Sequence, residues 1–247
     1  MLTWKVELKP GLDEARSYPY KVLLWNESGW TIIHEAVWHG LEWDLQGSSA
    51  YAWKIGERVA DESVTVVDDP TRANLRGYYS YDHEWNEAKK TVLIENWILK
   101  SYLHTNKTAE KFWVESTAHA RKEDYSCRNL VRMWTTYLDV WTDEKSDLIA
   151  KIDKWVYVSK MWGGQVNTVT WDFVFDVKFW YNIENWKIAW EIRGATISWN
   201  WPKMLENIYW ICSDLDFFDW WTCGKGQAMP VADWNPTFLT KLKVTGL

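Results

Sequence analysis

Two histidines and a glutamate lie close together in the segment His34-Glu35-Ala36-Val37-Trp38-His39 and could bind a metal ion. The segment is close to the HExxH pattern, in which two histidines on one helical face bind zinc and the glutamate acts as general base. Here the histidines are five positions apart, which on an α-helix turns them about 140° away from each other. The spacing therefore predicts two surface histidines that do not share a metal ion.

A second acidic group follows Ser213, where Asp214 and Asp216 are two positions apart and would share one face of a strand. Paired carboxylates of this kind can hold Mg²⁺. The Gly-Ser turn that nucleotidyltransferases place upstream of such a pair is missing here. An Asp-rich turn is the more ordinary interpretation. We therefore predict no metal site, with Asp214 and Asp216 as the candidates if one exists.

Three further carboxylates, Asp172, Asp176 and Glu191, lie on the polar faces of two expected strands and are the candidates for catalysis. On a concave sheet, carboxylates beside exposed tryptophan rings could bind a glycan or cleave it by acid catalysis. On a flat, half-exposed sheet they would be solvent-facing residues that pair with Lys178. The sequence favours the second interpretation.

Tryptophan is the unusual feature of the composition, with 23 Trp against 12 Gly, 12 Tyr and 7 Phe. Most of the tryptophans fall on the apolar faces of expected elements, which predicts that they belong to the core. Trp180, Trp220 and Trp221 do not fit such a face. They are the candidates for binding a glycan, a single-stranded nucleic acid or a protein.

Charge, cysteine content and hydropathy restrict the partners and the location. A net charge of −6 argues against duplex nucleic acid and anionic membranes as partners. A small-molecule or glycan ligand stays open, and the oligomeric state is not predicted. Cys127, Cys212 and Cys223 are expected to be reduced thiols, with a Cys212–Cys223 bridge as the alternative. The sequence shows no signal peptide or transmembrane helix, which predicts a cytoplasmic or recombinant protein.

The stretch 164–201 organises the expected fold. Apolar and polar residues alternate over 171–181, and the alternation resumes over 186–192. Two such runs joined by a short polar-biased segment predict an antiparallel hairpin with one buried face. Further strands are expected over 20–25 and 63–67, and over 237–245 as an edge strand whose lysines discourage further pairing.

Several helices are expected to cover this hairpin. Apolar residues at every fourth position from Ile33 to Leu45 predict a helix near 30–46. Other helices are expected near 83–103, 125–141 and 146–162, although 90–99 would also suit a strand. The last two helices would form an antiparallel αα-hairpin.

These elements predict an α+β fold in which an antiparallel sheet packs against the helices, after an N-terminal alternation of strand and helix. The expected strands of the sheet lie near 165–182, 186–201 and 237–245. One domain is expected over 1–247, with 163–164 as the candidate point of sub-division.

No nucleotide-binding or hydrolase fingerprint of the GxGxxG, GxxxxGK[ST] or GxSxG type occurs in the sequence. We therefore expect no cofactor. Many Trp, few Gly and Pro and no fingerprint favour a designed or synthetic protein without natural activity, and not an enzyme. A carbohydrate-binding or glycoside-cleaving protein is the first alternative. An outer-membrane β-barrel is the second, against which the expected helices and the missing signal peptide argue.

Overall fold

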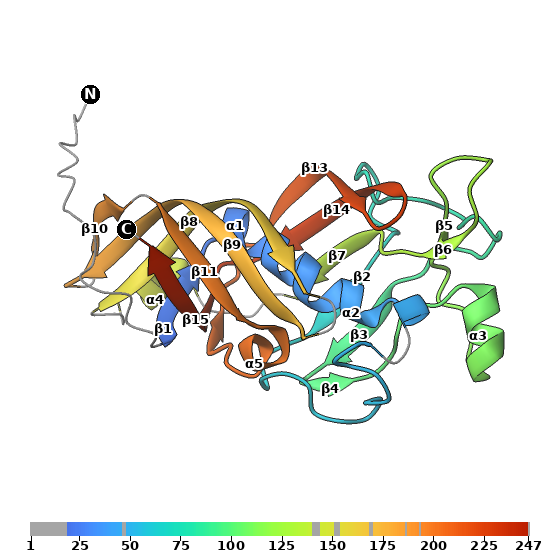
Figure 1. Ribbon diagram of the computed structural model, residues 1–247, viewed down its shortest axis with the longest axis horizontal. Coiled ribbons are helices and arrows are strands. Elements are labelled where there is room, and N and C mark those ends of the chain that lie inside the picture. The colour runs from blue at the N-terminus through green and yellow to red at the C-terminus, as the bar shows by residue number, and fades with distance from the viewer. Residues whose placement is uncertain are drawn as a thin grey trace. The chain divides into compact units, whose positions relative to one another are not determined.

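The structure is a computed structural model that describes residues 19–45, 48–139, 144–150, 154–167, 170–185, 187–192 and 194–246. Over these residues it contains fifteen strands and five α-helices, most of them short (Figure 1). The chain divides into two units, which we describe separately. Unit 1 comprises Met1–Gly29, Val140–Leu215 and Pro236–Leu247, and unit 2 comprises Trp30–Asp139 and Asp216–Asn235. The fold is mostly sheet, so the predicted α+β packing of a sheet against several long helices is wrong.

Unit 1 is built on a closed barrel of five strands. Their order is β1 (Pro19–Leu24), β8 (Lys154–Val166), β9 (Asp172–Glu184), β11 (Ala195–Asn200) and β15 (Phe238–Gly246), and β15 pairs back with β1. The β1–β8 pair is parallel and the other pairs are antiparallel. The remaining elements are β10 (Lys187–Ile192) beside β9, β12 (Trp210–Ile211) beside β15, and the helices α4 (Lys145–Ala150) and α5 (Trp201–Leu205). Residues 163 and 164 lie inside β8.

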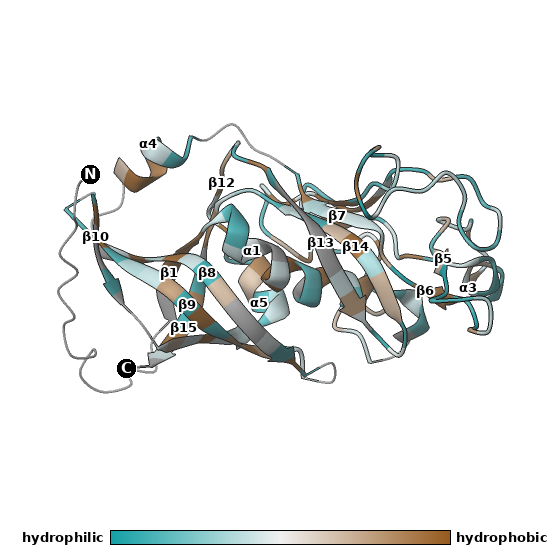
Figure 2. Ribbon diagram, turned by 90° about the horizontal axis from the view of Figure 1, so that it is seen from above, coloured by the Kyte–Doolittle hydropathy of each residue, from teal (hydrophilic) through white to brown (hydrophobic). Residues whose placement is uncertain are grey.

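The predicted hairpin is present, and its buried face is confirmed along β9, whereas Ile188 on β10 is 44% exposed and the prediction is wrong there. Strands β9 and β10 pair antiparallel. Along β9, Phe173, Phe175 and Val177 are buried, whereas Asp172 and Asp176 are exposed. Alternating hydrophobic and hydrophilic bands are visible along the strands in Figure 2. The period-two pattern therefore predicted both the strand and the face that it buries.

Strand β15 is not the edge strand that its lysines suggested. It pairs with β1, β11 and β12. Leu242 and Val244 are buried, while Lys243 between them is exposed. The charges therefore mark the outer face of a central strand rather than a free edge.

Unit 2 contains a six-stranded sheet and a small two-stranded one. The order of the large sheet is β13 (Asp216–Gly224), β14 (Ala228–Asn235), β7 (Thr135–Leu138), β2 (Val66–Asp68), β3 (Thr91–Glu95) and β4 (Ile98–Leu99). Only the β14–β7 pair in it is parallel among the described pairings. The small sheet pairs β5 (Ala120–Arg121) with β6 (Leu130–Val131).

Four helical segments follow one another near the start of this unit. They are α1 (Asn26–Ile33), which begins in unit 1, the π-helical turn η1 (His34–Trp38), α2 (His39–Leu41) and the 3₁₀ turn η2 (Trp43–Leu45). The helix α3 (Asn106–Phe112) comes later in the chain. The predicted helix near 30–46 is therefore largely present, and Ile33, Val37 and Leu41 on its apolar face are buried. None of the described helices is long and apolar enough to span a membrane.

The other predicted helices are wrong wholly or in part. Residues 83–103 contain β3 and β4, and residues 125–141 contain β6 and β7. Only the start of 146–162 is helical, as α4, and β8 begins at Lys154. The αα-hairpin is therefore not formed. Strand β7 is buried at all four positions, and such a run carries no alternation to distinguish it from the face of a helix.

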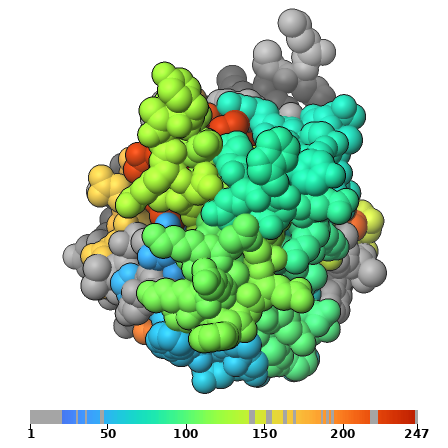
Figure 3. Space-filling view, turned by 90° about the vertical axis from the view of Figure 1, so that its right-hand side faces the viewer, coloured from blue at the N-terminus to red at the C-terminus, as the bar shows by residue number. Residues whose placement is uncertain are grey.

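Five tryptophans adopt the left-handed backbone conformation. These are Trp53, Trp85, Trp97, Trp113 and Trp171, whose φ angles lie between 57° and 65°. This conformation costs a residue with a Cβ about 1–2 kcal/mol of conformational free energy, whereas glycine adopts it without strain. The exposed residues Trp53, Trp85 and Trp113 belong to segments between η2 and β7, which form most of the surface in Figure 3.

Two of these positions are ones that usually select glycine. Trp97 is the second residue of the two-residue loop between β3 and β4, in which Glu95 pairs with Ile98. Both loop residues have positive φ, with Asn96 at 45°. This is the pattern of a type I′ turn, for which Asn-Gly is strongly preferred. Trp113 is the left-handed residue that ends α3, a position where glycine is most common.

We predict that the substitution Trp113→Gly stabilises the protein. The Trp113 side chain is 95% exposed, so little packing is lost when it is removed, while the backbone strain disappears. The free energy of unfolding in urea should rise by about 1 kcal/mol. Trp113→Ala is the matched control, because alanine keeps the Cβ and the strain. An equal gain in the alanine variant would contradict the explanation.

Candidate metal centre

His34 and His39 lie on the same face of the helical segment. His34 begins η1 and His39 begins α2. In a π-helical turn the backbone hydrogen bonds join residues i and i+5, so residues at this spacing return to one face. The two ring centroids are 5.2 Å apart. The prediction that the spacing separates them is wrong because it assumed α-helical geometry, and His34 is buried rather than on the surface.

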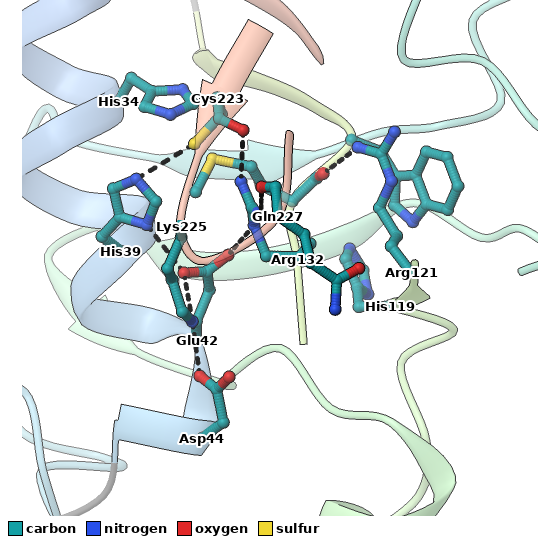
Figure 4. A network of polar contacts seen from close by, with 12 residues as sticks. His34, His39, Glu42, Asp44, His119, Arg121, Arg132, Cys223, Lys225 and Gln227 are labelled. Carbon is teal, nitrogen blue, oxygen red and sulfur yellow. Dashed lines mark hydrogen bonds and ion pairs between the residues drawn. The ribbon is translucent and has the colours of Figure 1, made fainter. Parts of the chain in front are cut away.

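Cys223 completes a cluster of three metal-binding side chains. It lies near the end of β13, and its Sγ is 3.2 Å from Nε2 of His39 (Figure 4). One donor atom from each of His34, His39 and Cys223 lies within 4.8 Å of the others. Cys223 is buried, and the side chain of His39 is 12% exposed. None of the three cysteines forms a disulfide, so the Cys212–Cys223 bridge is not formed.

A buried carboxylate holds the second nitrogen of each histidine. Nδ1 of His34 donates to Oδ1 of Asp233 at 2.9 Å, and Nδ1 of His39 donates to Oε2 of Glu42 at 2.8 Å. With the proton on Nδ1, the Nε2 atom of a neutral ring carries a lone pair. Nε2 of His34 is buried and has no hydrogen-bond partner among the described residues. The Nε2 atoms of the two histidines and the thiol of Cys223 are thus oriented so that they could bind a cation.

The charges around the cluster favour the thiolate form of Cys223. Burial raises the pKa of Cys223, but His34 and His39 outweigh this effect and bring the pKa down to about 6. Burial lowers the pKa of His39, whereas Glu42 and Cys223 raise it to about 9. The pKa of His34 is also raised, because Asp233 and Cys223 together outweigh its burial. Protons on the rings thus balance the thiolate, and a bound metal ion would replace them.

The donor set fits zinc. One thiolate and two imidazoles are ligands that zinc prefers, and three protein ligands leave a fourth position for water or substrate. Glu35 lies beside the cluster, with its Oε2 3.9 Å from Nε2 of His39, and its side chain is 28% exposed. A carboxylate that is both near the cluster and open to solvent could act as a general base.

The carboxylates that the sequence singled out lie in unit 1, on the barrel. Asp172 and Asp176 are exposed on β9, and Asp172 accepts a hydrogen bond from Nδ2 of Asn200 at 3.0 Å. Glu191 lies on β10 opposite Tyr181. It is therefore not directly across the sheet from either aspartate.

The remaining candidates are also dispersed. Asp214 accepts from the backbone N and the Oγ1 of Thr237, at 2.8 and 2.7 Å, while Asp216 is exposed at the start of β13. Asp214 and Asp216 belong to different units. Trp180 is buried at 1% exposure. Trp220 and Trp221 lie in β13, but their side chains are outside the described part of the structure.

Comparison with known proteins finds a family model and relatives that match this chain. Residues 17–246 match the PmbA/TldA metallopeptidase C-terminal domain. The chain is 36% identical over 240 residues to a metalloprotease TldD homolog from Buchnera aphidicola, with 94% of this chain and 49% of the relative covered. It is 34% identical over 248 residues to a metalloprotease from Archaeoglobus fulgidus, with 98% and 57% covered.

The fold is also similar to that of a solved structure. The crystal structure of TldE from Thermococcus kodakarensis matches with a TM-score of 0.78 at 18% identity, covering 92% of this chain and 50% of that one. The chain spans about half the length of the curated relatives it matches.

We predict that the metal-free protein binds a divalent zinc or cobalt ion through His34, His39 and Cys223. Cobalt(II) should produce an absorption band for charge transfer from the thiolate, and Cys223→Ser should abolish it. Cys127→Ser is the matched control, because Cys127 is a free thiol of the same unit that lies outside the cluster. A band that persists in the Cys223 variant, or that disappears in the Cys127 variant, would refute this ligand set.

Proposed function

Since this chain belongs to the PmbA/TldA metallopeptidase family, we propose that it binds zinc and uses the bound ion to hydrolyse peptide bonds. The observation that supports this most is the convergence of His34, His39 and Cys223, with a buried carboxylate on Nδ1 of each histidine. The proposal concerns the polypeptide that contains this chain, because the chain spans about half the length of its relatives.

Family membership corrects the interpretation of the composition. The matches to proteins from bacteria and archaea show a natural protein, so the prediction of a designed or synthetic sequence is wrong. They favour neither the carbohydrate alternative nor the outer-membrane one. Relatives named as metalloproteases support a peptide as the substrate.

In this proposal each side chain has a separate task. A bound zinc ion would supply positive charge beside the substrate carbonyl and make a water molecule more acidic. Oε2 of Glu35 accepts a proton from the attacking water and returns it to the nitrogen of the leaving amine. Asp233 and Glu42 keep the Nδ1 protons in place, so that the Nε2 lone pairs of His34 and His39 stay directed at the centre. Water and peptide bond are thereby converted into a carboxylic acid and an amine.

We predict that Glu35→Gln strongly slows hydrolysis but preserves the metal. The zinc-loaded protein, in the polypeptide that carries this chain, is incubated with a mixture of unstructured peptides, and new termini are detected by mass spectrometry. The rate should fall by about 10²–10⁴-fold, while the zinc content stays unchanged.

Glu62→Gln is the control for this experiment. Glu62 is an exposed glutamate of the same unit outside the cluster, and its loss should leave the rate unaltered. Peptide hydrolysis by the Glu35 variant at the unaltered rate would refute the assigned base. No hydrolysis by the zinc-loaded unaltered protein would refute the peptidase activity.

A further inference from the structure

Arg132 is a fully buried arginine that contacts two of the chain segments around the metal centre. Its Nη2 donates to the backbone oxygen of Cys223 at 3.0 Å, and its Nη1 donates to that of Gln227 at 2.8 Å. Both carbonyls belong to the hairpin between β13 and β14. On its other side, Nε of Arg132 forms an ion pair with Oε1 of Glu42 at 3.3 Å. Figure 4 shows this guanidinium between the hairpin and the helical segment.

Glu42 is the matching group on the helical segment. Its Oε2 accepts from Nδ1 of His39 and from Nζ of Lys225, both at 2.8 Å. Lys225 also contacts Oδ1 of Asp44 at 2.6 Å. A basic group therefore contacts each oxygen of this buried carboxylate.

We propose that the Glu42–Arg132 pair positions the ligands of the metal centre. Arg132 fixes the backbone that carries Cys223, Glu42 fixes the ring of His39, and their ion pair sets the separation of the two ligands. His39 and Cys223 are 184 residues apart in the chain, so local backbone geometry cannot set that separation. The inference rests on the proposed function, because it assigns these residues to the same metal centre.

The chemistry of the two side chains suits this task. A guanidinium presents several N–H donors in a fixed plane, so it can bind two carbonyls and a carboxylate at once. The ammonium of a lysine is a single point of charge on a flexible stem and cannot span the same three acceptors. A buried ion pair contributes little net stability compared with apolar residues of similar size. A role in geometry explains better than stability why this pair is buried beside the centre.

The test compares Arg132→Lys and Glu42→Gln with a matched buried carboxylate. Each variant is made in the polypeptide that carries this chain, and its zinc affinity, cobalt(II) absorption spectrum and unfolding free energy are measured. We expect both variants to lose about 10–100-fold in zinc affinity and to shift the cobalt spectrum. In peptide hydrolysis kcat should fall while KM stays near its original value, because the substrate contacts are not altered.

Asp68→Asn is the matched control. Asp68 is fully buried in the same unit and accepts from the backbone N of Trp134 and Thr135, at 2.9 and 3.0 Å. It is not part of the metal cluster, so its loss should lower stability but leave the zinc affinity and the cobalt spectrum unchanged. Unchanged zinc affinity and an unchanged spectrum in Arg132→Lys and Glu42→Gln would overturn the proposal.

The experiment tests the positioning role even if one variant does not fold or if the protein has another activity than the proposed one. Glu42→Asp keeps the charge with a shorter reach, and it should weaken zinc binding in the same way; unchanged affinity in a folded Glu42→Asp protein overturns the proposal. Zinc affinity and the cobalt spectrum do not depend on peptide hydrolysis. A protein that binds zinc but cleaves no peptide would refute the proposed function while leaving the positioning role testable by these two measurements.

An independent observation concerns tryptophans at positions that suit glycine. Five of the nine non-glycine residues with positive φ in the described part of the chain are tryptophans. The left-handed strain would disappear if glycine occupied these five positions.

We infer that the gene encodes the five left-handed tryptophans with a codon that its host reads as glycine. UGA differs by one base from the tryptophan codon UGG and by one base from the glycine codon GGA. Reading UGA as tryptophan at these five positions would add five to the 23 Trp and remove five from the Gly, of which 12 are left. It would also place tryptophan in a type I′ turn and at a helix end, where glycine is preferred.

The nucleotide sequence and the native protein test this inference. The codons for Trp53, Trp85, Trp97, Trp113 and Trp171 should all be UGA. Peptides of the protein isolated from its source cells should show the mass of glycine at these positions by mass spectrometry. UGG codons at these positions, or tryptophan in the native peptides, would overturn it.

Discussion

The geometry of the metal centre depends on one departure from the regular α-helix, the π-helical turn η1. An α-helix would place His34 and His39 about 140° apart around its axis. The turn at η1 returns both rings to one face and directs them at β13, where Cys223 lies. Single π-helical turns are uncommon and are found mostly at functional sites. Here the π-helical turn brings the two histidines together as the proposed pair of ligands.

The buried charges around the centre balance if a divalent ion is bound. The thiolate of Cys223 and the carboxylate of Asp233 would offset the two positive charges of the ion, with both histidines neutral. Around them Glu42 and Asp44 are offset by Arg132 and Lys225. Without the ion, the same balance requires extra protons on the histidines, which is why their pKa values are raised. An unpaired charge at this depth would be costly, so the arrangement of the acidic and basic groups itself indicates a cation.

Part of this structure could be predicted from the sequence. Alternation predicted β9 and its buried face, and the spacing of Ile33, Val37 and Leu41 predicted the helical segment. It did not contain the π-helical turn as a local signal, and Cys223 and Asp233 approach His34 only through tertiary structure. The spacing of the two histidines, one residue too long for an α-helical pair, therefore gave no indication of a shared metal ion.

Tryptophan also concealed the turns. An Asn-Gly pair at positions 96 and 97 would have indicated a hairpin between β3 and β4. With Asn96-Trp97 at these positions, the segment was predicted to be part of a helix. The same residues, counted as composition, favoured a synthetic protein. Both errors have one physical cause, a large side chain at positions whose backbone conformation suits glycine. Glycine and other turn residues mark where one helix or strand ends and the next begins. A tryptophan in place of such a residue therefore affects the prediction of the fold more than a change of any core residue. The metal centre was not concealed in this way, because its ligands and carboxylates are none of the residues concerned.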